Sequence, residues 1–431
     1  MNTILLNPSD VLFFRDGRPM GGASSGQGSA WPLPTVINHA FHAALHRAEF
    51  ETVHKHVPGR SSSQRDYSEA NRESNGRLFG SLTTAGPFPV CTHGAGHTWF
   101  FPRPADADDT GKSVLFPVKP LGASSLPATL QYAVGSTQTP SKETPKNWWS
   151  EEAWNTYLGS AQRDDLAARL FHKSDADFAD TEHAYGIAID PGTSSVVEGQ
   201  FYSAHYLRLR PGWALGVLAE AWDKELNGDL VGKLLNGSGN QIITGGQQRI
   251  CTAECQIVQR LPLPVGAAIT GTRVKWILLT PAIFPEINDH KGGWLPSWVD
   301  MDGNVQLLDG PGKNAAKRRK VAEGKRIEAT LVSAITGKPI PVTGYALPNS
   351  AAPDRQEGGA KSTHLAVPPG AVYYFECKTP EAAQALANAL NWHGNDTNPK
   401  AIHNRRSTLM GEKGFGLGVC GSWDFHPSAK S

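Results

Sequence analysis

Regularly spaced apolar residues in the first 50 positions predict a strand followed by a helix. The strand covers Thr3 to Leu6 and is continued by Val11 to Phe14. The helix begins near Thr35, because apolar residues recur three and four positions apart and would share one face: Val36, Ile37, Ala40, Phe41, Ala44, Leu45 and Ala48. Both elements are therefore expected in a folded core.

The pattern becomes irregular and polar from about Glu51 to Glu182. We interpret this stretch as an insertion with one or two short helices, at Glu151–Leu158 and Asp164–Phe171. Regular patterning then returns in four elements. They are a hairpin of Tyr185–Asp190 and Gly199–Leu209 around a Pro191–Gly192 turn, a helix from Leu230 to Leu235 with Asp229 as N-cap and Gly237 just past its end, and a strand at Arg249–Gln256.

The second half of the chain seems to repeat this order of elements. Thr379 as N-cap, followed by Pro380 at the first helical position, begins the most clearly marked helix, which runs through Leu386 and Leu390. The other predicted elements are strands at Val274–Thr280, Pro339–Ala346, Val372–Cys377 and Gly414–Trp423, with a weaker helix in Arg326–Ile335.

Without the insertion, each half has the order strand, helix, strand, strand, helix, strand, which is that of a ferredoxin-like fold. We therefore predict an α+β protein of two ferredoxin-like (RRM-like) domains. They span 1–264 and 265–431, with a long insertion at about 51–182 in the first. The boundary is placed near Pro264, because the preceding Leu-Pro-Leu-Pro connection cannot be helical.

Composition limits the kinds of partner that the whole molecule can attract. The 431 residues include 41 Lys plus Arg and 40 Asp plus Glu, so the formal charge is only +1. Any site for a polyanion must then be a local patch. No basic leader precedes the first strand, and no apolar run approaches the roughly 20 residues that cross a bilayer. We expect a soluble, cytoplasmic protein without a membrane partner.

Cysteine and histidine patterns give no support for a metal or cofactor. The five cysteines form an odd, sparse set that fits buried free thiols, including Cys251 and Cys255. His39, His42 and His46 fall on the first helix, where packed or exposed histidines are more common than ligands. The sequence contains no nucleophile elbow, P-loop, HExxH or paired CxxC motif. We predict no catalytic residue, no metal and no cofactor.

Cationic and glycine-rich loops carry the candidate chemistry. The segment Lys313–Arg326 is strongly basic and includes Lys317, Arg318 and Arg319. Clustered cations of this kind can bind a nucleic-acid backbone, although a solvated charge run explains them equally well. Glycines can let such a backbone approach closely, and they occur at Gly245 and Gly246 before Arg249, and around Lys413 and Phe415. Plain glycine-rich turns are the alternative at both places.

Several motifs together resemble one known family. The opening Val-Leu-Phe-Phe-Arg-Asp-Gly-Arg-Pro (Val11–Pro19), followed by a glycine-serine loop and the helix start at Pro34–Thr35, resembles the third subunit of the type III-B CRISPR effector, the Cmr complex. Further similar motifs follow in order: Tyr185–Asp190, Gly199 to Arg208, Thr244–Gly246 with Arg249, Val367–Phe375 and Gly414–Gly418. The resemblance spans both predicted domains but not the insertion.

This resemblance implies a RAMP, Cas-five-like protein with two ferredoxin-like domains. It implies a non-catalytic subunit that holds the 5′ repeat-derived handle of the CRISPR RNA in antiviral defence. The expected protein partners are the Cas10-type large subunit and the Cas-seven-like backbone subunit, and target RNA is an additional candidate. Bases stack on aromatics and phosphates bind cations and backbone amides, so the RNA-binding candidates are Arg15, Arg18, Gly21, Gly22, Ser24, Ser25, Arg249, Lys317, Arg318, Arg319, Lys413 and Phe415.

Two other functions remain open at this point. One is a RAMP endoribonuclease that processes precursor CRISPR RNA, with His39 or His42 as general base near Arg15. The other is a protein-only scaffold subunit that makes no RNA contact.

Overall fold

The computed structural model describes most of the 431-residue chain, and its contacts group the residues into two compact units. The described segments are 1–15, 25–26, 31–48, 81–94, 96–109, 112–119, 124–139, 146–159, 172–223, 227–236, 240–286, 292–309, 325–346 and 359–427. The first unit combines Met1–His97, Ala176–Ile257 and Pro341–His364. The second combines Thr98–Asp175, Val258–Ile340 and Leu365–Ser431. This interleaved grouping differs from the contiguous division predicted at Pro264.

An antiparallel sheet forms the centre of the first unit. Its neighbouring strands are, in spatial order, β14 (Gln241–Ile243), β15 (Ile250–Gln256), β1 (Asn2–Pro8), β11 (Trp213–Glu220) and β3 (Thr83–His93). If β1, β3, β11 and β15 are numbered along the chain, their order across the sheet is 4-1-3-2. Helix α1 (Pro34–Arg47) connects β1 to β3, and α6 (Leu230–Asn236) lies between β11 and β15 in the sequence.

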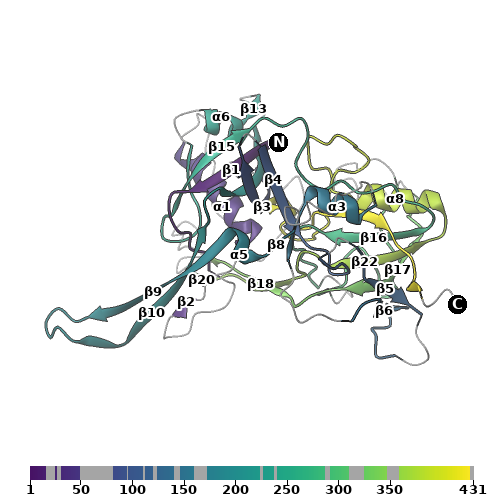
Figure 1. Cartoon of the computed structure of the whole chain (residues 1–431), viewed down its shortest axis with the longest axis horizontal. Helices are drawn as coiled ribbons and strands as arrows, with labels where there is room; N and C mark the ends of the chain where they lie inside the picture. Colours follow the sequence, from purple (N-terminus) through teal and green to yellow (C-terminus); the bar gives the residue numbers. More distant parts are fainter. Residues whose placement is uncertain are drawn as a thin grey trace. The chain divides into compact units, whose positions relative to one another are not determined.

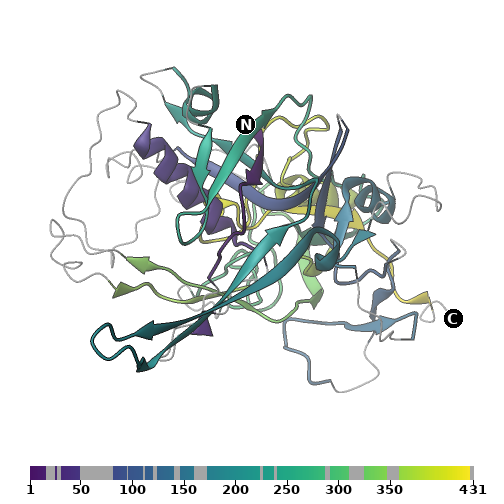
Figure 2. The ribbon, with the colours of Figure 1, turned by 60° about the vertical axis from the view of Figure 1, so that its left-hand side comes forward.

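Both helices pack against this sheet, and Figure 2 shows α1 lying along it. Alternate residues of each strand point to the helices, as expected for strands with one face on a core. The shared core includes Ile4, Leu6, Ile37, Phe41, Leu45, Leu215, Val217, Val231, Leu234 and Ala253. The helical apolar spacing in the sequence thus corresponds to a buried helix face.

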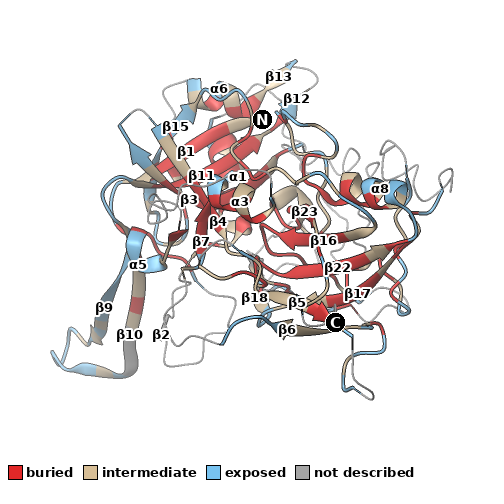
Figure 3. Cartoon of the chain, turned by 45° about the vertical axis from the view of Figure 1, so that its right-hand side comes forward, coloured by how far each residue is buried: buried red, intermediate tan, exposed pale blue. Residues whose placement is uncertain are grey.

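A long hairpin projects from the first unit. Strands β9 (Ala179–Ile189) and β10 (Val196–Leu209) extend away from the sheet, and β2 (Ser25–Gly26) pairs in parallel with β10 (Figure 1). The described residues near its tip are largely exposed, in contrast to the central strands (Figure 3). Its base continues into the unit, where Ala204 and Leu207 are buried.

The second unit is built on another antiparallel sheet. Its strands lie in the order β17 (Ala329–Ile335), β22 (Val372–Cys377), β16 (Arg273–Leu278) and β23 (Gly418–Ser422). Numbered along the chain, this order is 2-3-1-4, which is 4-1-3-2 counted from the other edge. Helix α8 (Pro380–Leu390) packs on the sheet through Ala383, Leu386, Ala387 and Leu390.

Shorter elements complete the described structure. In the second unit they include β4 (Gly96–Pro102), β5 (Leu115–Val118), β6 (Ala133–Ser136), β7 (Trp148–Ser150), α3 (Glu151–Tyr157), β8 (His172–Lys173) and the 3-10 turn η3 (Gly411–Lys413). The others are α5 (Asp175–Phe178), β12 (Trp222–Asp223), β13 (Gly228–Asp229), β18 (Ile340–Val342), β19 (Tyr345–Ala346), β20 (Gly359–Ala360) and β21 (His364–Ala366). No helix among the described residues combines the length and apolar composition needed to cross a bilayer.

The best-signalled elements of the sequence are confirmed. Thr379 caps α8, because its side-chain oxygen accepts a hydrogen bond from the Ala382 N–H at 3.2 Å. Helices α1, α3 and α6 lie where they were predicted, and β22 has the predicted bounds. The α+β class, with mostly antiparallel sheets, is also as predicted.

Three predictions of elements are wrong. The stretch taken as an irregular insertion contains β3, whose residues Thr84–Val90 are all buried. The predicted hairpin pairs with β2 as a separate sheet, and β3 and β11 take the places in the main sheet that it was expected to fill. The weak helix in Arg326–Ile335 is strand β17, which pairs with β22. The predicted helix at Asp164–Phe171 lies outside the described residues.

Candidate nucleic-acid interface

The segment that follows β1 is fixed from two sides in the first unit. Leu12 and Leu207 of β10 exchange two backbone hydrogen bonds of 2.8 Å, and the N–H of Gly246 donates to the carbonyl oxygen of Phe13 at 2.8 Å. Phe13 and Phe14 are buried, whereas Arg15 is exposed. The buried phenylalanines therefore anchor a backbone from which Arg15 reaches solvent.

Gly245 and Gly246 are required by this packing rather than by an open surface. Gly245 has φ +81°, and a Cβ atom there would lie 2.5 Å from the Phe13 carbonyl oxygen and 2.9 Å from the Phe14 ring. A Cβ on Gly246 would lie 2.7 Å from the Phe13 ring. The prediction that these glycines let an RNA backbone approach is thus replaced by a close approach of the protein's own segments.

The turn that begins with these glycines places Arg249 over an aromatic ring. The guanidinium carbon of Arg249 is 5.1 Å from the centroid of Tyr206, whose ring lies 5.5 Å from that of Phe13. The Tyr206 hydroxyl donates to Gln247 Oε1 at 2.8 Å. Arg249 Nε is buried and has no hydrogen-bond partner in the described part of the chain. The cluster presents a cation and an aromatic ring together, which is suited to a stacked base.

Acidic residues set the charge around Arg249. Asp10 Oδ1 accepts from Arg208 at 2.9 Å, and Asp10 Oδ2 lies 3.5 Å from Arg249. The Val11 N–H and Arg208 lower the pKa of the Asp10 carboxyl, so it remains ionised at neutral pH. Arg208 is also paired with Glu182. Asp10 thus orients the two arginines and offsets part of their charge.

The other candidates of the first unit are described only in part. Ser25 belongs to β2, which pairs with Ser203 and Ala204 of β10. Arg15 has no ion pair within the described segments. Arg18, Gly21, Gly22 and Ser24 lie outside the described residues. The structure therefore brings the Arg15 segment, β2 and the Arg249 turn against the same strand, β10.

In the second unit, the candidate Phe415 is buried. It is fully inaccessible to solvent, so its ring cannot serve as a stacking platform as predicted. The surrounding glycines have packing roles: a Cβ on Gly416 would lie 2.0 Å from Ser407 N, and one on Gly418 would lie 2.3 Å from Trp276 Nε1. Lys413 in η3 is half-buried. Lys317, Arg318 and Arg319 lie outside the described residues.

Metal-binding and nucleophilic groups are not assembled in the described segments. These segments contain no group of three or more His, Cys, Asp or Glu placed to hold a metal ion. On α1, His39 is exposed, and the rings of His42 and His46 stand 4.5 Å apart. All five cysteines are free, and Cys251 is buried, but Cys255 is exposed, contrary to the prediction for that pair.

The sequence reasoning missed Asp10, Tyr206 and Gln247. Alternation along β10 was a signal for Tyr206, because the buried Leu207 implies that its neighbours Tyr206 and Arg208 face the other way. No local pattern indicated that this face would meet the turn at Gln247, which is 41 residues from Tyr206 in sequence.

Comparisons with known proteins give a family match over nearly the whole chain. The model of the family described as "CRISPR-associated protein (Cas_Cmr3)" matches residues 4–423. A chain in the cryo-EM structure of the type III-B Cmr-beta bound to cognate target RNA and AMPPnP is 15% identical, with 88% of this chain and 86% of that chain covered and a TM-score of 0.40. A chain of the Csm3–Csm4 subcomplex from the type III-A CRISPR-Cas interference complex is 10% identical, with coverages of 88% and 93% and a TM-score of 0.37. Curated proteins gave no significant match.

Proposed function

Since the chain belongs to the CRISPR-associated Cas_Cmr3 family, and is thus a CRISPR effector subunit, we propose that it holds the 5′ repeat-derived handle of the CRISPR RNA and has no catalytic role of its own. In the same proposal it links the Cas10-type large subunit to the Cas-seven-like backbone of a type III-B ribonucleoprotein in antiviral defence. Target RNA is an additional candidate partner.

The strand order of each unit supports two ferredoxin-like modules of the RAMP type. Both sheets have the order 4-1-3-2, and the first unit carries a helix in each of the two positions that a βαββαβ unit requires. In the second unit α8 occupies the later of these positions. Sheets of this kind are common platforms for single-stranded RNA.

One observation carries the RNA-binding proposal, namely the stacked Phe13, Tyr206 and Arg249 beside the exposed Arg15. Single-stranded RNA is held by bases stacked on aromatic or guanidinium planes and by cations at its phosphates. Tyr206 and Arg249 offer the first kind of contact, and Arg15 offers the second. Because Phe13, Gly246 and Leu207 fix the backbone around them, little ordering would be needed on binding.

Handle binding by the purified full chain tests the proposal. We expect Arg15→Ala to weaken binding of a labelled handle RNA and to reduce the slope of log K against log salt by about 0.7, as for one phosphate contact on a single strand. Arg249→Ala should weaken binding with a smaller change in slope, because stacking rather than charge is lost. Arg210→Ala is the control, since its guanidinium is already paired with Asp180 at 2.7 Å. If both test variants bind as the unmodified chain does, RNA is not held at this cluster.

The same RNA samples distinguish a subunit that only binds from a nuclease. The handle and a repeat-containing precursor should remain uncut over hours in the absence of metal. Metal-independent cleavage that disappears in His42→Ala would contradict the non-catalytic role. Native mass spectrometry of the assembled complex tests the linking role: omission of this chain should separate the large subunit from the backbone subunits.

A further inference from the structure

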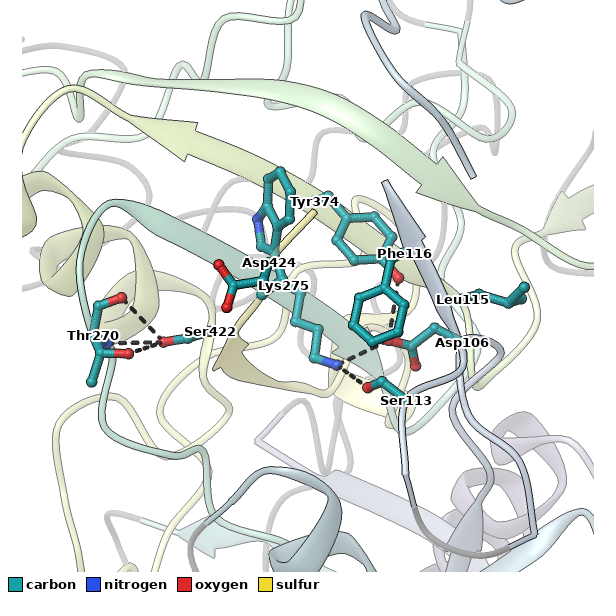
Figure 4. A pocket seen from close by; sticks show the side chains of 10 residues that line it. Asp106, Ser113, Leu115, Phe116, Thr270, Lys275, Tyr374, Ser422 and Asp424 are labelled. Atoms are coloured by element: carbon teal, nitrogen blue, oxygen red, sulfur yellow. Dashed lines mark hydrogen bonds and ion pairs between the residues drawn. The ribbon is translucent and has the colours of Figure 1, made fainter. Parts of the chain in front are cut away.

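A cavity of about 260 Å³ opens in the second unit beside the edge strand β23. Figure 4 shows two different sides to it: Phe116, Tyr374 and Leu115 lie on one side of the Lys275 side chain, and Thr270, Ser422 and Asp424 lie on the other. One wall is thus aromatic and apolar, and the opposite wall carries hydroxyl and carboxylate oxygens. Phe116 is only half-buried, so its ring is accessible from the cavity.

The charges at the base of the cavity are satisfied within the protein. Lys275 Nζ donates to Asp106 Oδ2 and to Ser113 Oγ, both at 2.9 Å, and it lies 4.1 Å from the ring centroid of Tyr157. The Tyr374 hydroxyl donates to Asp106 at 3.2 Å. Burial and the Asp106 charge keep the pKa of the Tyr374 hydroxyl well above its ordinary value, so it remains a donor. The ammonium group of Lys275 is therefore committed to internal contacts.

This charge distribution does not suit an anionic ligand. The cavity has one ammonium group, Lys275, against two carboxylates, Asp106 and Asp424, so a phosphate inside it would meet a net negative lining. A cationic side chain is also disfavoured, because Arg273 already occupies that role at the rim. Its guanidinium bonds Asp424 at 3.0 Å and lies over Trp423 and Phe425 at 5.5 and 4.7 Å.

A flat, uncharged ring with amino donors fits the remaining features. An aromatic wall favours stacking of a planar ring. Carboxylate and hydroxyl oxygens on the opposite wall accept hydrogen bonds, and a carboxylate can accept several at once. The volume is below the usual 300–1,000 Å³ of small-molecule sites, which suits a single base rather than a whole nucleotide.

We propose that this cavity binds one nucleobase that bears an exocyclic amino group, with Phe116 as the stacking surface and Asp424 as an acceptor for the amino group. Uracil is discriminated against, because its edge offers carbonyl oxygens where the cavity also offers acceptors. This inference extends the proposed RNA-binding function with a second contact point in the other unit. The base comes from single-stranded RNA or from a free nucleoside, which share this chemistry.

Equilibrium dialysis of the full chain against adenosine, cytidine and uridine tests the proposal. We expect adenosine and cytidine to bind about fivefold more tightly than uridine, as one additional charge-assisted hydrogen bond would give. Phe116→Ala should weaken adenosine binding about tenfold through loss of stacking. Phe116→Leu, which keeps an apolar side chain in place, should do so with less risk to folding. Asp424→Ala should remove the preference over uridine. Tyr185→Ala, an exposed aromatic in the other unit, is the matched control and should change nothing.

Each outcome supports or overturns the assignment. Displacement of adenosine by oligoadenylate identifies RNA as the source of the base, and failure of oligoadenylate to displace it identifies a free nucleoside. No binding of adenosine at millimolar concentration, or equal binding of uridine, overturns the proposal. Displacement of adenosine by N-acetylarginine amide would assign the cavity to a protein side chain instead. If handle binding depends on Arg15 while nucleosides do not bind, only the cavity assignment fails and the proposed function stands.

Discussion

The Lys275 ammonium group lies 2.9 Å from the Asp106 carboxylate, and the two side chains are only 6% and 1% exposed. Asp106 also accepts from the hydroxyls of Tyr157 and Tyr374 at 2.6 and 3.2 Å. Lys275 belongs to the central strand β16, whereas Asp106 follows β4 in a segment far away in sequence. A buried, fully bonded ion pair therefore ties this segment to the sheet of the second unit.

Removal of one partner of this pair should be strongly destabilising. Lys275→Met leaves the Asp106 charge buried without its cation, and such a change costs about 3–5 kcal/mol. Thermal unfolding followed by circular dichroism should show a large fall in Tm. Lys378→Met is the control: its side chain is 73% exposed beside Glu328, so it should cost less than about 1 kcal/mol. Similar losses in both variants would show that the buried pair has no special role.

Gly245→Ala should disturb both stability and RNA binding. The new Cβ would meet the Phe13 carbonyl oxygen at 2.5 Å and force the anchored segment before Arg15 to move. Gly271→Ala provides the comparison, because Gly271 has a similar φ of +75° but nothing within 4 Å of the added atom. Gly271→Ala should therefore cost only the backbone penalty, about 1–2 kcal/mol. A lower Tm and weaker handle binding for Gly245→Ala than for Gly271→Ala are expected, and equal effects would contradict the packing role.

The stability of the second unit should fall as the pH drops below about 6.5, the ordinary pKa of histidine. Burial lowers the pKa of His393, and its Nε2 accepts a hydrogen bond from the Gly266 N–H at 3.0 Å. Below pH 6.5 the unfolded chain binds a proton that the folded ring refuses, so protonation favours unfolding. The stabilisation is complete above this pH and is lost as the pH falls toward the lowered pKa.

Melting curves at pH 7.5 and 5.5 check this expectation. His393→Gln should have a lower Tm than the unmodified chain at pH 7.5 but a smaller difference between the two pH values. His93→Gln, at an exposed position, should retain the full pH dependence. An unchanged pH dependence in His393→Gln would show that other groups control it.

Alkylation should distinguish the cysteines of the native chain. Burial raises the pKa of Cys251 to about 11 and that of Cys377 to about 12, and it raises the pKa of Cys420 further still. Cys255 is exposed at the end of β15. Iodoacetamide at pH 8 should therefore modify Cys255 well before these three, as mass spectrometry of peptides would show. Equal rates in the native chain would contradict the burial of Cys251.

Elements with strong local signals were predictable from the sequence. The Thr379–Pro380 start of α8 and the apolar stripe of α1 each specify a helix within one short window. Strand β3 gave no such signal, because its core contains Gly86, Pro87 and Pro89, residues that normally argue against a central strand. Only its pairing with β11, more than 100 residues later, explains why it forms.

The candidate site was predictable only where a side chain alone determines its role. Arg15 and Arg249 were identified as exposed or partly exposed cations, and both lie beside β10 as described above. Phe415 was misjudged because a glycine in the sequence does not reveal what faces its missing side chain. Near Gly416 and Gly418 that neighbour is the protein itself, at Ser407 and Trp276. Tyr206 was missed because its partners come from a distant turn.

The division of the chain between units also constrains how it is made. A ribosome synthesises Thr98–Asp175 of the second unit before β11 and β15 of the first have emerged, and long before β16 exists. Neither unit can be completed from a continuous stretch of the nascent polypeptide, so the usual sequential folding of domains from the N-terminus is excluded. The Asp106 segment must wait for Lys275, 169 residues later, before its buried charge is neutralised.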